Sequence, residues 1–315
     1  MNVLSLFDGI SCGRVSLERG GHRVHKYFAS EIDKYAISIS QKNYPDIIQL
    51  GNIEKWREWD IDLASINLLL AGSPCQGFSF AGKGLNFEDP RSKLFFVFVD
   101  IFRHIKKLNP DVKFLLENVR MKGEHELAIT RTLDTLPIYI NSALVSAQNR
   151  NRIYWTNILG GGFLEEISQP EDMGILLQDI LESGTADKIK SNPILAQYHK
   201  VNAKSGLKRY HEKHIGQLVR IGNIGKGGQG NRIVSPMGKS YALSAESSGR
   251  AGGGGSLIPT TTGWRKLSPI ECERLQTIPD NYTEGISKSR RYHALGNAWT
   301  VDVIVHILKG LKGTR

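Results

Sequence analysis

Hydrophobic and polar positions in the first half of the chain alternate between two spacings. Short apolar runs typical of buried strands cover residues 2–7, 23–31, 47–50, 66–72 and 112–119. Helical spacing between and after them covers residues 11–21, 34–44, 93–107 and 125–136. Two more strand-like runs follow, at 139–148 and 152–158. This alternation predicts an α/β fold with a doubly wound, mostly parallel sheet, whose last two runs form an antiparallel hairpin at one edge.

The pattern changes after about Gly160. Residues 220–256 are rich in glycine and basic residues and show no clear period. A flexible linker is one interpretation of such a segment. We favour a loop-rich lobe, because its basic side chains are interleaved with the β-forming runs "LVRI", "RIV" and "YALS". Helical spacing returns at residues 300–313, and we expect this segment to pack back onto the first domain.

Polar residues and glycines follow several of the predicted strands. They are Asp8, Gly9, Glu31, Asn52, Cys75, Glu117 and Asn118. In open α/β sheets, ligands bind outside the carboxyl ends of the strands. The sequence therefore predicts one crevice that collects these residues.

Composition narrows the class of protein. The chain has 315 residues, a formal net charge of +10 and a sequence pI of about 9.4. This charge favours a polyanionic partner, although charge alone is a weak argument for nucleic acid. Its three cysteines are far apart and odd in number, which argues against a disulfide framework and a zinc site and predicts a reducing compartment. No segment is typical of a signal peptide or a membrane span, and we expect neither a membrane nor a metal.

Residues 8–13 form a glycine-containing turn between a predicted strand and a predicted helix, and Glu31 ends the next strand. Such a turn lets the backbone approach a ligand closely, and an acidic residue at this distance can accept hydrogen bonds from ribose hydroxyls. A cofactor that contains a nucleoside is one interpretation. An ordinary tight turn is the other, because the full G-x-G-x-x-G pattern is missing.

Cys75 lies after Pro74 in "GSPCQGFSF", a stretch of small and polar residues. Most cysteines are small buried hydrophobic residues, but these neighbours do not provide the packing that a core cysteine needs. A nucleophilic thiol needs electropositive surroundings or a base that removes its proton. The candidate cations are Lys83, Arg91, Arg150 and Arg152.

Glu117 and Asn118 end the predicted strand "KFLLEN" and point to the same crevice. A carboxylate in such a place is most often a helix cap or a salt-bridge partner. Attack of a thiolate on a heterocyclic base, however, needs a proton or a strong hydrogen bond at a ring nitrogen, and Glu117 could supply it.

Nine short motifs follow one another along nearly the whole chain: "FDGISCG", "SEID", "GNI", "GSPCQGFSFAGK", "SKLFF", "LLENV", "QNRNRIYW", "RKLSPIECERLQTIPDNY" and "GNAWTVDVI". In this order they resemble the motifs of the DNA cytosine C5-methyltransferases. Any one of these motifs is fallible, but the ordered set is very specific. The first two are similar both to bacterial and phage enzymes and to the catalytic domain of animal de novo methyltransferases.

The resemblance implies catalytic roles. Cys75 would attack C6 of a cytosine flipped out of the duplex, and Glu117 would stabilise the protonated N3. Arg152, with Arg150 nearby, would hold O2 and the ring. C5 would then take a methyl group, and loss of the C5 proton would expel the cysteine. Two further groups would recognise the base, Asn118 and the Pro74 carbonyl.

The resemblance also implies a cofactor, S-adenosylmethionine, which leaves as S-adenosylhomocysteine. It implies, too, that the sheet is of the type found in methyltransferases that use this cofactor. The residues that would line its site are Phe7, Gly9, Ile10, Ser11, Glu31, Ile32, Asn52, Ile53, Leu94, Asn297 and Ala298. The chain departs from many relatives at Ser11 and Cys12, where they carry glycines, and at Asn52, where an aspartate usually binds the adenine amino group. We expect Asn52 to accept that hydrogen bond without a charge and so to bind the cofactor more weakly.

The domain division that follows is a catalytic domain of residues 1–160 plus 291–315 and a smaller target-recognition domain of residues 161–290. The expected substrate is a specific sequence in double-stranded DNA, bound by a monomer in the cytoplasm, or in the nucleus if the source is eukaryotic. A cognate restriction endonuclease in a restriction-modification system is an expected partner. Two alternatives stay open: a tRNA cytosine C5-methyltransferase and a catalytically silent DNA-binding homologue.

Overall fold

A computed structural model describes residues 1–73, 90–121, 123–159, 166–183, 220–223, 232–234, 240–241, 257–260 and 263–313. The chain forms two compact units. The first comprises Met1–Ile140, Asn151–Pro170 and Val301–Arg315, and the second comprises Asn141–Arg150 and Glu171–Thr300. Relative to the division expected from the sequence, residues 141–150 and 291–300 group with the second unit and residues 161–170 with the first.

The first unit is built on a seven-stranded sheet with the order β3-β2-β1-β4-β5-β8-β6. Its strands are β1 (Asn2–Leu6), β2 (Lys26–Ser30), β3 (Ile48–Gln49), β4 (Leu68–Gly72), β5 (Lys113–Val119), β6 (Ile138–Asn141) and β8 (Asn151–Thr156). The β1–β2, β1–β4, β2–β3 and β4–β5 pairs are parallel, and β5–β8 is antiparallel. The mostly parallel sheet predicted from the sequence is therefore confirmed.

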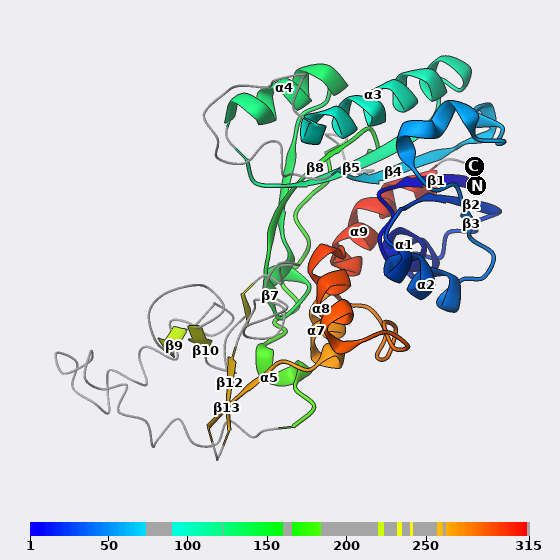
Figure 1. The fold of residues 1–315 in the computed structure, drawn as a ribbon. Coiled ribbons are helices and arrows are strands. Elements are labelled where there is room, and N and C mark those ends of the chain that lie inside the picture. Colours follow the sequence, from blue (N-terminus) through cyan, green and yellow to red (C-terminus); the bar gives the residue numbers. More distant parts are fainter. Residues whose placement is uncertain are drawn as a thin grey trace. The chain divides into compact units, whose positions relative to one another are not determined.

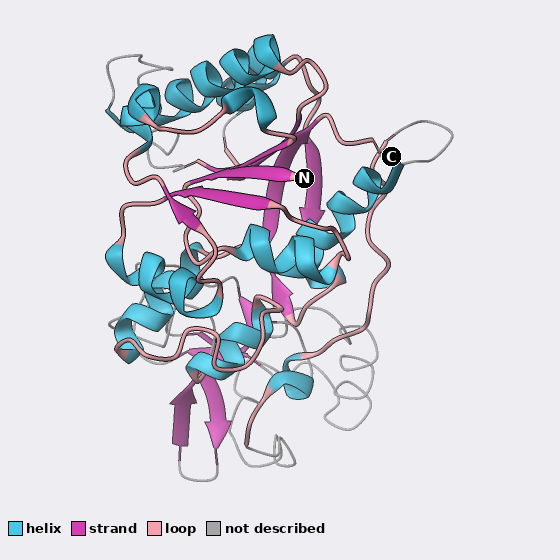
Figure 2. Cartoon of the chain, turned by 90° about the vertical axis from the view of Figure 1, so that its right-hand side faces the viewer, coloured by secondary structure: helices cyan, strands magenta, loops and turns pink. Residues whose placement is uncertain are grey.

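Helices cover both faces of this sheet. The α-helices are α1 (Cys12–Arg19), α2 (Lys34–Asn43), α3 (Pro90–Leu108), α4 (Gly123–Leu133) and α9 (Val301–Leu308), and the 3₁₀ helices are η1 (Ile53–Glu58), η2 (Leu63–Ser65) and η9 (Lys309–Gly313). Figure 1 shows α3 and α4 on one face and α1, α2 and α9 on the other. Figure 2 shows the strands, in magenta, from a second direction with helices on either side. The sheet is doubly wound, as the alternating pattern predicts.

Aromatic side chains join α3 to the sheet. Phe95, Phe98 and Phe102 are buried along this helix, and the ring of Phe102 lies 4.5 Å, between centroids, from that of Phe114 on β5. Burial of such rings on one helix face stabilises the packing of the helix on the sheet. No helix in the part of the chain that the structure describes is long and apolar enough to span a bilayer.

The C-terminal segment packs on the first unit, as expected. Helix α9 lies against α1, where the Ser16 hydroxyl donates to the Val301 carbonyl over 3.4 Å and Arg19 pairs with Asp302 at 2.5 Å. Beyond α9, the backbone of Gly310 lies close to that of Leu159. A Cβ at Gly310 would lie 1.9 Å from the Leu159 carbonyl oxygen. Only glycine fits at this position.

Two predicted elements end earlier than the pattern suggests. The run at 139–148 breaks at Asn141, whose side chain accepts from the Ala143 N–H over 3.1 Å and caps η3 (Ser142–Leu144). Only β6 and the short β7 (Gln148–Asn149) are strands in this range, with β6 next to β8 at the sheet edge. Helix α4 ends at Leu133 because Asp134 takes a left-handed conformation, with φ 52°.

The second unit contains α5 (Leu177–Ile180), α7 (Pro269–Leu275) and α8 (Lys288–Asn297). Its strands β9 (Arg220–Asn223), β10 (Arg232–Val234), β12 (Leu257–Thr260) and β13 (Gly263–Lys266) form one sheet, and β11 (Ser240–Tyr241) pairs with β7. Strands β9, β10 and β11 overlap the three β-forming runs noted in the sequence. These strands support a folded lobe over a flexible linker.

Candidate functional site

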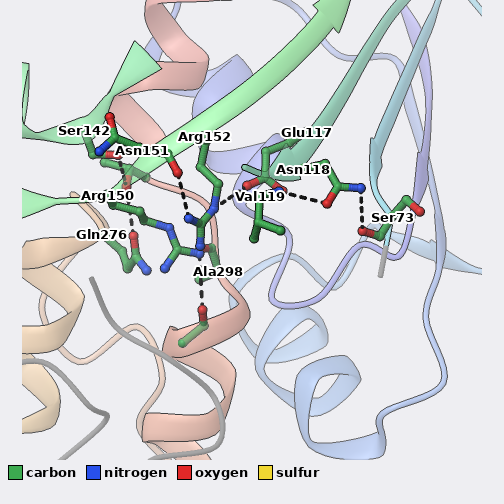
Figure 3. Close-up of polar contacts among 12 residues, drawn as sticks. Ser73, Glu117, Asn118, Val119, Ser142, Arg150, Asn151, Arg152, Gln276 and Ala298 are labelled. Atoms are coloured by element: carbon green, nitrogen blue, oxygen red, sulfur yellow. Dashed lines mark hydrogen bonds and ion pairs between the residues drawn. The ribbon is translucent and has the colours of Figure 1, made fainter. Parts of the chain in front are cut away.

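Glu117 and Arg152 form an ion pair at the end of β5. In the antiparallel β5–β8 ladder, Glu117 lies opposite Tyr154 and Val119 opposite Arg152. Glu117 and Arg152 are therefore diagonal neighbours on the same face of the sheet. The Arg152 Nε lies 2.9 Å from Glu117 Oε1, and only 9% of Glu117 is exposed (Figure 3). The register holds a carboxylate and a guanidinium together where water is largely excluded.

Asn118 alternates to the opposite face and connects β5 to the end of β4. Its Nδ2 donates to the Ser73 carbonyl over 3.4 Å, and its Oδ1 accepts from the Val119 N–H over 2.8 Å (Figure 3). Ser73 directly precedes Pro74 and Cys75 in the sequence. Asn118 thus anchors the last described residue before the Pro-Cys dipeptide. Pro74 and Cys75 themselves lie outside the described residues.

Arg150 belongs to the second unit and has a different environment. It is 4% exposed, and its guanidinium donates to the carbonyls of Gly296 and Ala298 over 3.2 and 3.1 Å (Figure 3). Ala298, the C-cap of α8, is also buried, whereas Asn297 is exposed at the last position of that helix. These contacts favour a positioning role for Arg150 on the segment that follows α8.

A buried polar network near Arg150 was missed by the sequence reasoning. Gln148 donates to the Leu275 carbonyl and to Gln276 Oε1 over 3.0 and 3.2 Å. Gln276 Oε1 also accepts from the Thr300 hydroxyl over 3.0 Å, which in turn accepts from Ser142 over 2.9 Å. Two glutamines in the motifs could have indicated this network: Gln148, which begins "QNRNR", and Gln276, which follows "ECERL". The network fixes the ends of α7 and η3 within the second unit.

The turn after β1 reverses direction with three left-handed residues, Phe7, Gly9 and Ser11, whose φ angles are 56°, 60° and 61°. Glu31, at the end of β2, holds this turn through its carboxylate. Its Oε2 accepts from the Gly9 N–H over 2.8 Å, and its Oε1 accepts from the N–H groups that follow, of Ile32 at 2.7 Å and Asp33 at 2.8 Å. The carboxylate is thereby fixed at the carboxyl ends of two adjacent parallel strands, as predicted.

The remaining predicted cofactor residues of the first unit divide into two groups. Ile32 is 75% exposed, and Asn52 is exposed as the N-cap of η1, where its Oδ1 accepts from the Glu54 N–H over 3.0 Å. Ile10 and Ile53 are buried, so their side chains pack inside the fold. Leu94 is partly buried against the core. A carboxylate beside an exposed apolar side chain at the strand ends fits a ribose and an adenine ring.

Asp8 has the most perturbed carboxylate in this turn. Burial raises its pKa to about 6. Hydrogen bonds from the hydroxyls of Ser11, Ser5 and Tyr27 lower this pKa, and the nearby Glu31 carboxylate raises it further. The sequence placed Asp8 at the end of a strand but gave it no role. Its signal was its position, one residue before the glycine of the turn.

The described cysteines are poor candidates for a nucleophile. Cys12 and Cys272 are both buried, and burial raises the pKa of the Cys272 thiol. Within the described ranges, no group of three or more His, Cys, Asp or Glu side chains is placed to hold a metal ion.

Comparison with known proteins agrees with the geometry. The family described as C-5 cytosine-specific DNA methylase matches residues 1–313. The chain is 30% identical over 321 residues to the type II methyltransferase M.HhaI of Haemophilus parahaemolyticus, covering 98% of this chain and 93% of that protein. It is 29% identical over 335 residues to the type II methyltransferase M.HpaII of Haemophilus parainfluenzae, covering 96% and 86%.

Solved structures show the same fold at low sequence identity. A mutant of the Spodoptera frugiperda protein DNMT2 superposes with a TM-score of 0.64 and 20% identity over 99% of both chains. A putative DNA modification methyltransferase encoded within an Escherichia coli prophage superposes with a TM-score of 0.65 and 19% identity, again over 99% of both chains. The chain belongs to the C-5 cytosine-specific DNA methylase family and is a DNA (cytosine-5-)-methyltransferase.

Proposed function

We propose that the chain transfers a methyl group from S-adenosylmethionine to C5 of a cytosine that is flipped out of duplex DNA, through a covalent bond between Cys75 and C6. The observation that carries this proposal is the ion pair of Glu117 and Arg152 at the end of β5. It places an acid and a cation at the edge where the strand before Cys75 also ends.

Each residue of the site has a chemical task in this proposal. The Cys75 thiolate forms a bond to C6, and Glu117 donates a hydrogen bond or proton to N3, so that the electrons displaced from the ring accumulate at C5. Arg152 binds O2 and, through its contact with Glu117, keeps the carboxyl group in line with N3. After C5 is methylated, a base removes the C5 proton and the C6–sulfur bond breaks, which regenerates the thiolate.

Arg150 has a different role, within the second unit. Its guanidinium donates to the backbone carbonyls of Gly296 and Ala298. We therefore assign it a positioning role and leave contact with the base to Arg152. Asn118 holds the Ser73 carbonyl, and so the chain directly before Pro74, at the end of β4.

The first unit supplies the cofactor site in this proposal. S-adenosylmethionine, when bound, supplies the electrophilic methyl group. Glu31 accepts hydrogen bonds from the ribose hydroxyls, Ile32 covers one face of the adenine ring, and Asn52 binds its edge. The left-handed turn from Phe7 to Ser11 lets the backbone approach the ligand closely.

We further propose that residues 161–290 recognise a specific DNA sequence. Their glycines and basic side chains suit contacts to phosphates and guanines. We expect the enzyme to act as a monomer. We also expect a cognate restriction endonuclease, because the curated relatives are type II methyltransferases.

The test uses duplex DNA that carries 5-fluorocytosine, which cannot lose a proton from C5 and traps the covalent complex. With S-adenosylmethionine present, wild type is expected to form an adduct that mass spectrometry maps to Cys75. Cys75→Ser should form none and still bind DNA. Glu117→Gln should slow adduct formation by on the order of a hundred-fold, because proton transfer to N3 is lost. The exposed Glu124→Gln is the matched control and should react normally.

Three results would contradict the proposal. An adduct at Cys12 or Cys272 would overturn the assignment of the nucleophile. Parallel reactions would compare tRNA with duplex DNA. If labelled methyl groups appeared on tRNA alone, the substrate would be tRNA and not DNA. DNA binding without any methyl transfer would indicate a silent homologue.

A further inference from the structure

The turn after β1 contains a residue whose backbone conformation is unfavourable for its type. Ser11 has φ 61° and ψ 39° at the N-cap of α1, in the left-handed region that glycine adopts easily and other residues rarely adopt. Its side chain does not cap the helix. The hydroxyl must therefore serve another purpose in the turn.

The Ser11 hydroxyl is tied to Asp8 and to α2. It donates to Asp8 Oδ2, and it lies 2.6 Å from the Ser40 hydroxyl. Because its single proton is directed at the carboxylate, Ser11 accepts from Ser40. The Ser11 N–H also donates to the Asp8 carbonyl over 3.1 Å. Ser11 is completely buried, so these contacts replace every hydrogen bond that its hydroxyl would make with water.

Asp8 connects this contact to the sheet. Its Oδ1 accepts from the Tyr27 hydroxyl over 2.8 Å, and Tyr27 is a buried residue of β2. Its N–H donates to the Ser30 carbonyl over 3.2 Å. The carboxylate of Asp8 is thus bound by side-chain hydroxyls, whereas that of Glu31 is bound by backbone N–H groups. The two acids of the turn have different tasks.

We propose that Asp8 is a positioning residue of the cofactor site, which acts by holding Ser11 in the left-handed conformation and thereby sets the path of the turn from Phe7 to Ser11. The inference rests on the proposed S-adenosylmethionine site, because the same turn carries the Gly9 N–H that Glu31 binds. Asp8 acts through Ser11 and does not itself touch the ligand.

A double-mutant cycle tests this inference, with the dissociation constant for S-adenosylmethionine measured by calorimetry on the full chain. Asp8→Asn is expected to weaken binding by on the order of ten-fold, the size expected when a non-glycine residue loses its support in the left-handed region. Ser11→Gly removes only a completely buried hydroxyl and keeps the backbone with which Ser11 would line the cofactor site. It should bind within about two-fold of wild type, because glycine needs no support in the left-handed region. In the Ser11→Gly background, Asp8→Asn should have almost no further effect.

Equal loss from Asp8→Asn in both backgrounds would mean that Asp8 acts independently of Ser11, and would overturn the inference. No loss in either background would overturn it as well. If Asp8→Asn fails to fold, Ser11→Ala carries the test, since it should lose binding where Ser11→Gly does not.

Two controls separate this test from other failures. Asp62→Asn removes an exposed carboxylate that caps η2 and should leave binding unchanged. Wild type that does not bind S-adenosylmethionine would contradict the proposed function, whereas a cycle without coupling would contradict only the role of Asp8. Steady-state kinetics should show a higher KM for the cofactor in Asp8→Asn with kcat changed much less.

Discussion

Residues of one type bind different partners in this protein because their surroundings differ. Arg152 pairs with the Glu117 carboxylate, while the guanidinium of Arg150, two positions earlier, donates to the backbone carbonyls of Gly296 and Ala298. Asp8 and Glu31 differ in the same way, since hydroxyls bind one and backbone N–H groups the other. A motif identifies such residues, but the partner of each determines its chemistry.

The raised pKa of Asp8 predicts a pH dependence of stability. Burial raises this pKa from 3.8 to about 6, so the folded state binds a proton more tightly than the unfolded state. The stabilisation is complete below pH 3.8 and is lost as the pH rises through about 6. Glu31 and Tyr27 are the titratable groups that face Asp8, and Glu31 strengthens the shift.

Melting temperatures of wild type and Asp8→Asn, measured between pH 4 and pH 8, check this prediction. The difference between the two curves should change in favour of Asp8→Asn as the pH rises through about 6. Parallel curves would show that Asp8 has an ordinary pKa.

Two buried ion pairs fix helix α7 within the second unit. Glu271 accepts from both terminal nitrogens of Arg265 on β13, at 2.7 Å each. Glu273 pairs with Arg291 on α8 at 2.8 Å and accepts from the N–H groups of Asn281 and Thr283 at 2.7 and 2.8 Å. Neither glutamate is exposed. This helix was not predicted from the pattern. Two signals could have indicated it: Ser268 and Glu271 form a capping box, and Pro269 lies in the first turn.

Glu273→Gln is expected to destabilise the protein by about 3 kcal/mol. The substitution leaves the Arg291 charge without its carboxylate in a buried place and removes one acceptor from the loop at Asn281 and Thr283. Urea unfolding monitored by tryptophan fluorescence measures the change. Glu171→Gln, an exposed residue of the same unit, is the matched control and should change stability by less than about 0.5 kcal/mol. A similar small effect of Glu273→Gln would contradict the importance of the pair.

The charge of the whole molecule is unevenly distributed along the sequence. Residues 188–250 carry twelve Lys and Arg against two Glu, so their formal charge of +10 equals that of the entire chain. The remaining residues are balanced. A polyanion such as DNA releases counterions where its phosphates meet these cations. We therefore expect the second unit to supply the electrostatic part of DNA binding.

The salt dependence of DNA binding tests this assignment. Lys208→Gln with Arg209→Gln should weaken binding to duplex DNA and reduce the slope of log K against log salt by about one unit for each phosphate contact that is lost. Lys106→Gln with Lys107→Gln, at the exposed end of α3, is the matched control and should leave the slope unchanged. Fluorescence anisotropy over a salt series measures both. A larger change in the control pair would overturn the assignment.

The sequence alone determined the alternation of strands and helices, because spacing and apolar composition are local properties, and its ordered motifs determined the family. It also indicated which residues follow the strands. Only the tertiary structure decided that Arg152 faces Glu117, since this depends on the register of two antiparallel strands that are distant in the sequence. It likewise decided the environment of Asp8 and the end of the strand at Asn141. The burial and the hydrogen-bond partners of a residue depend on several elements at once, so a local sequence pattern cannot predict them.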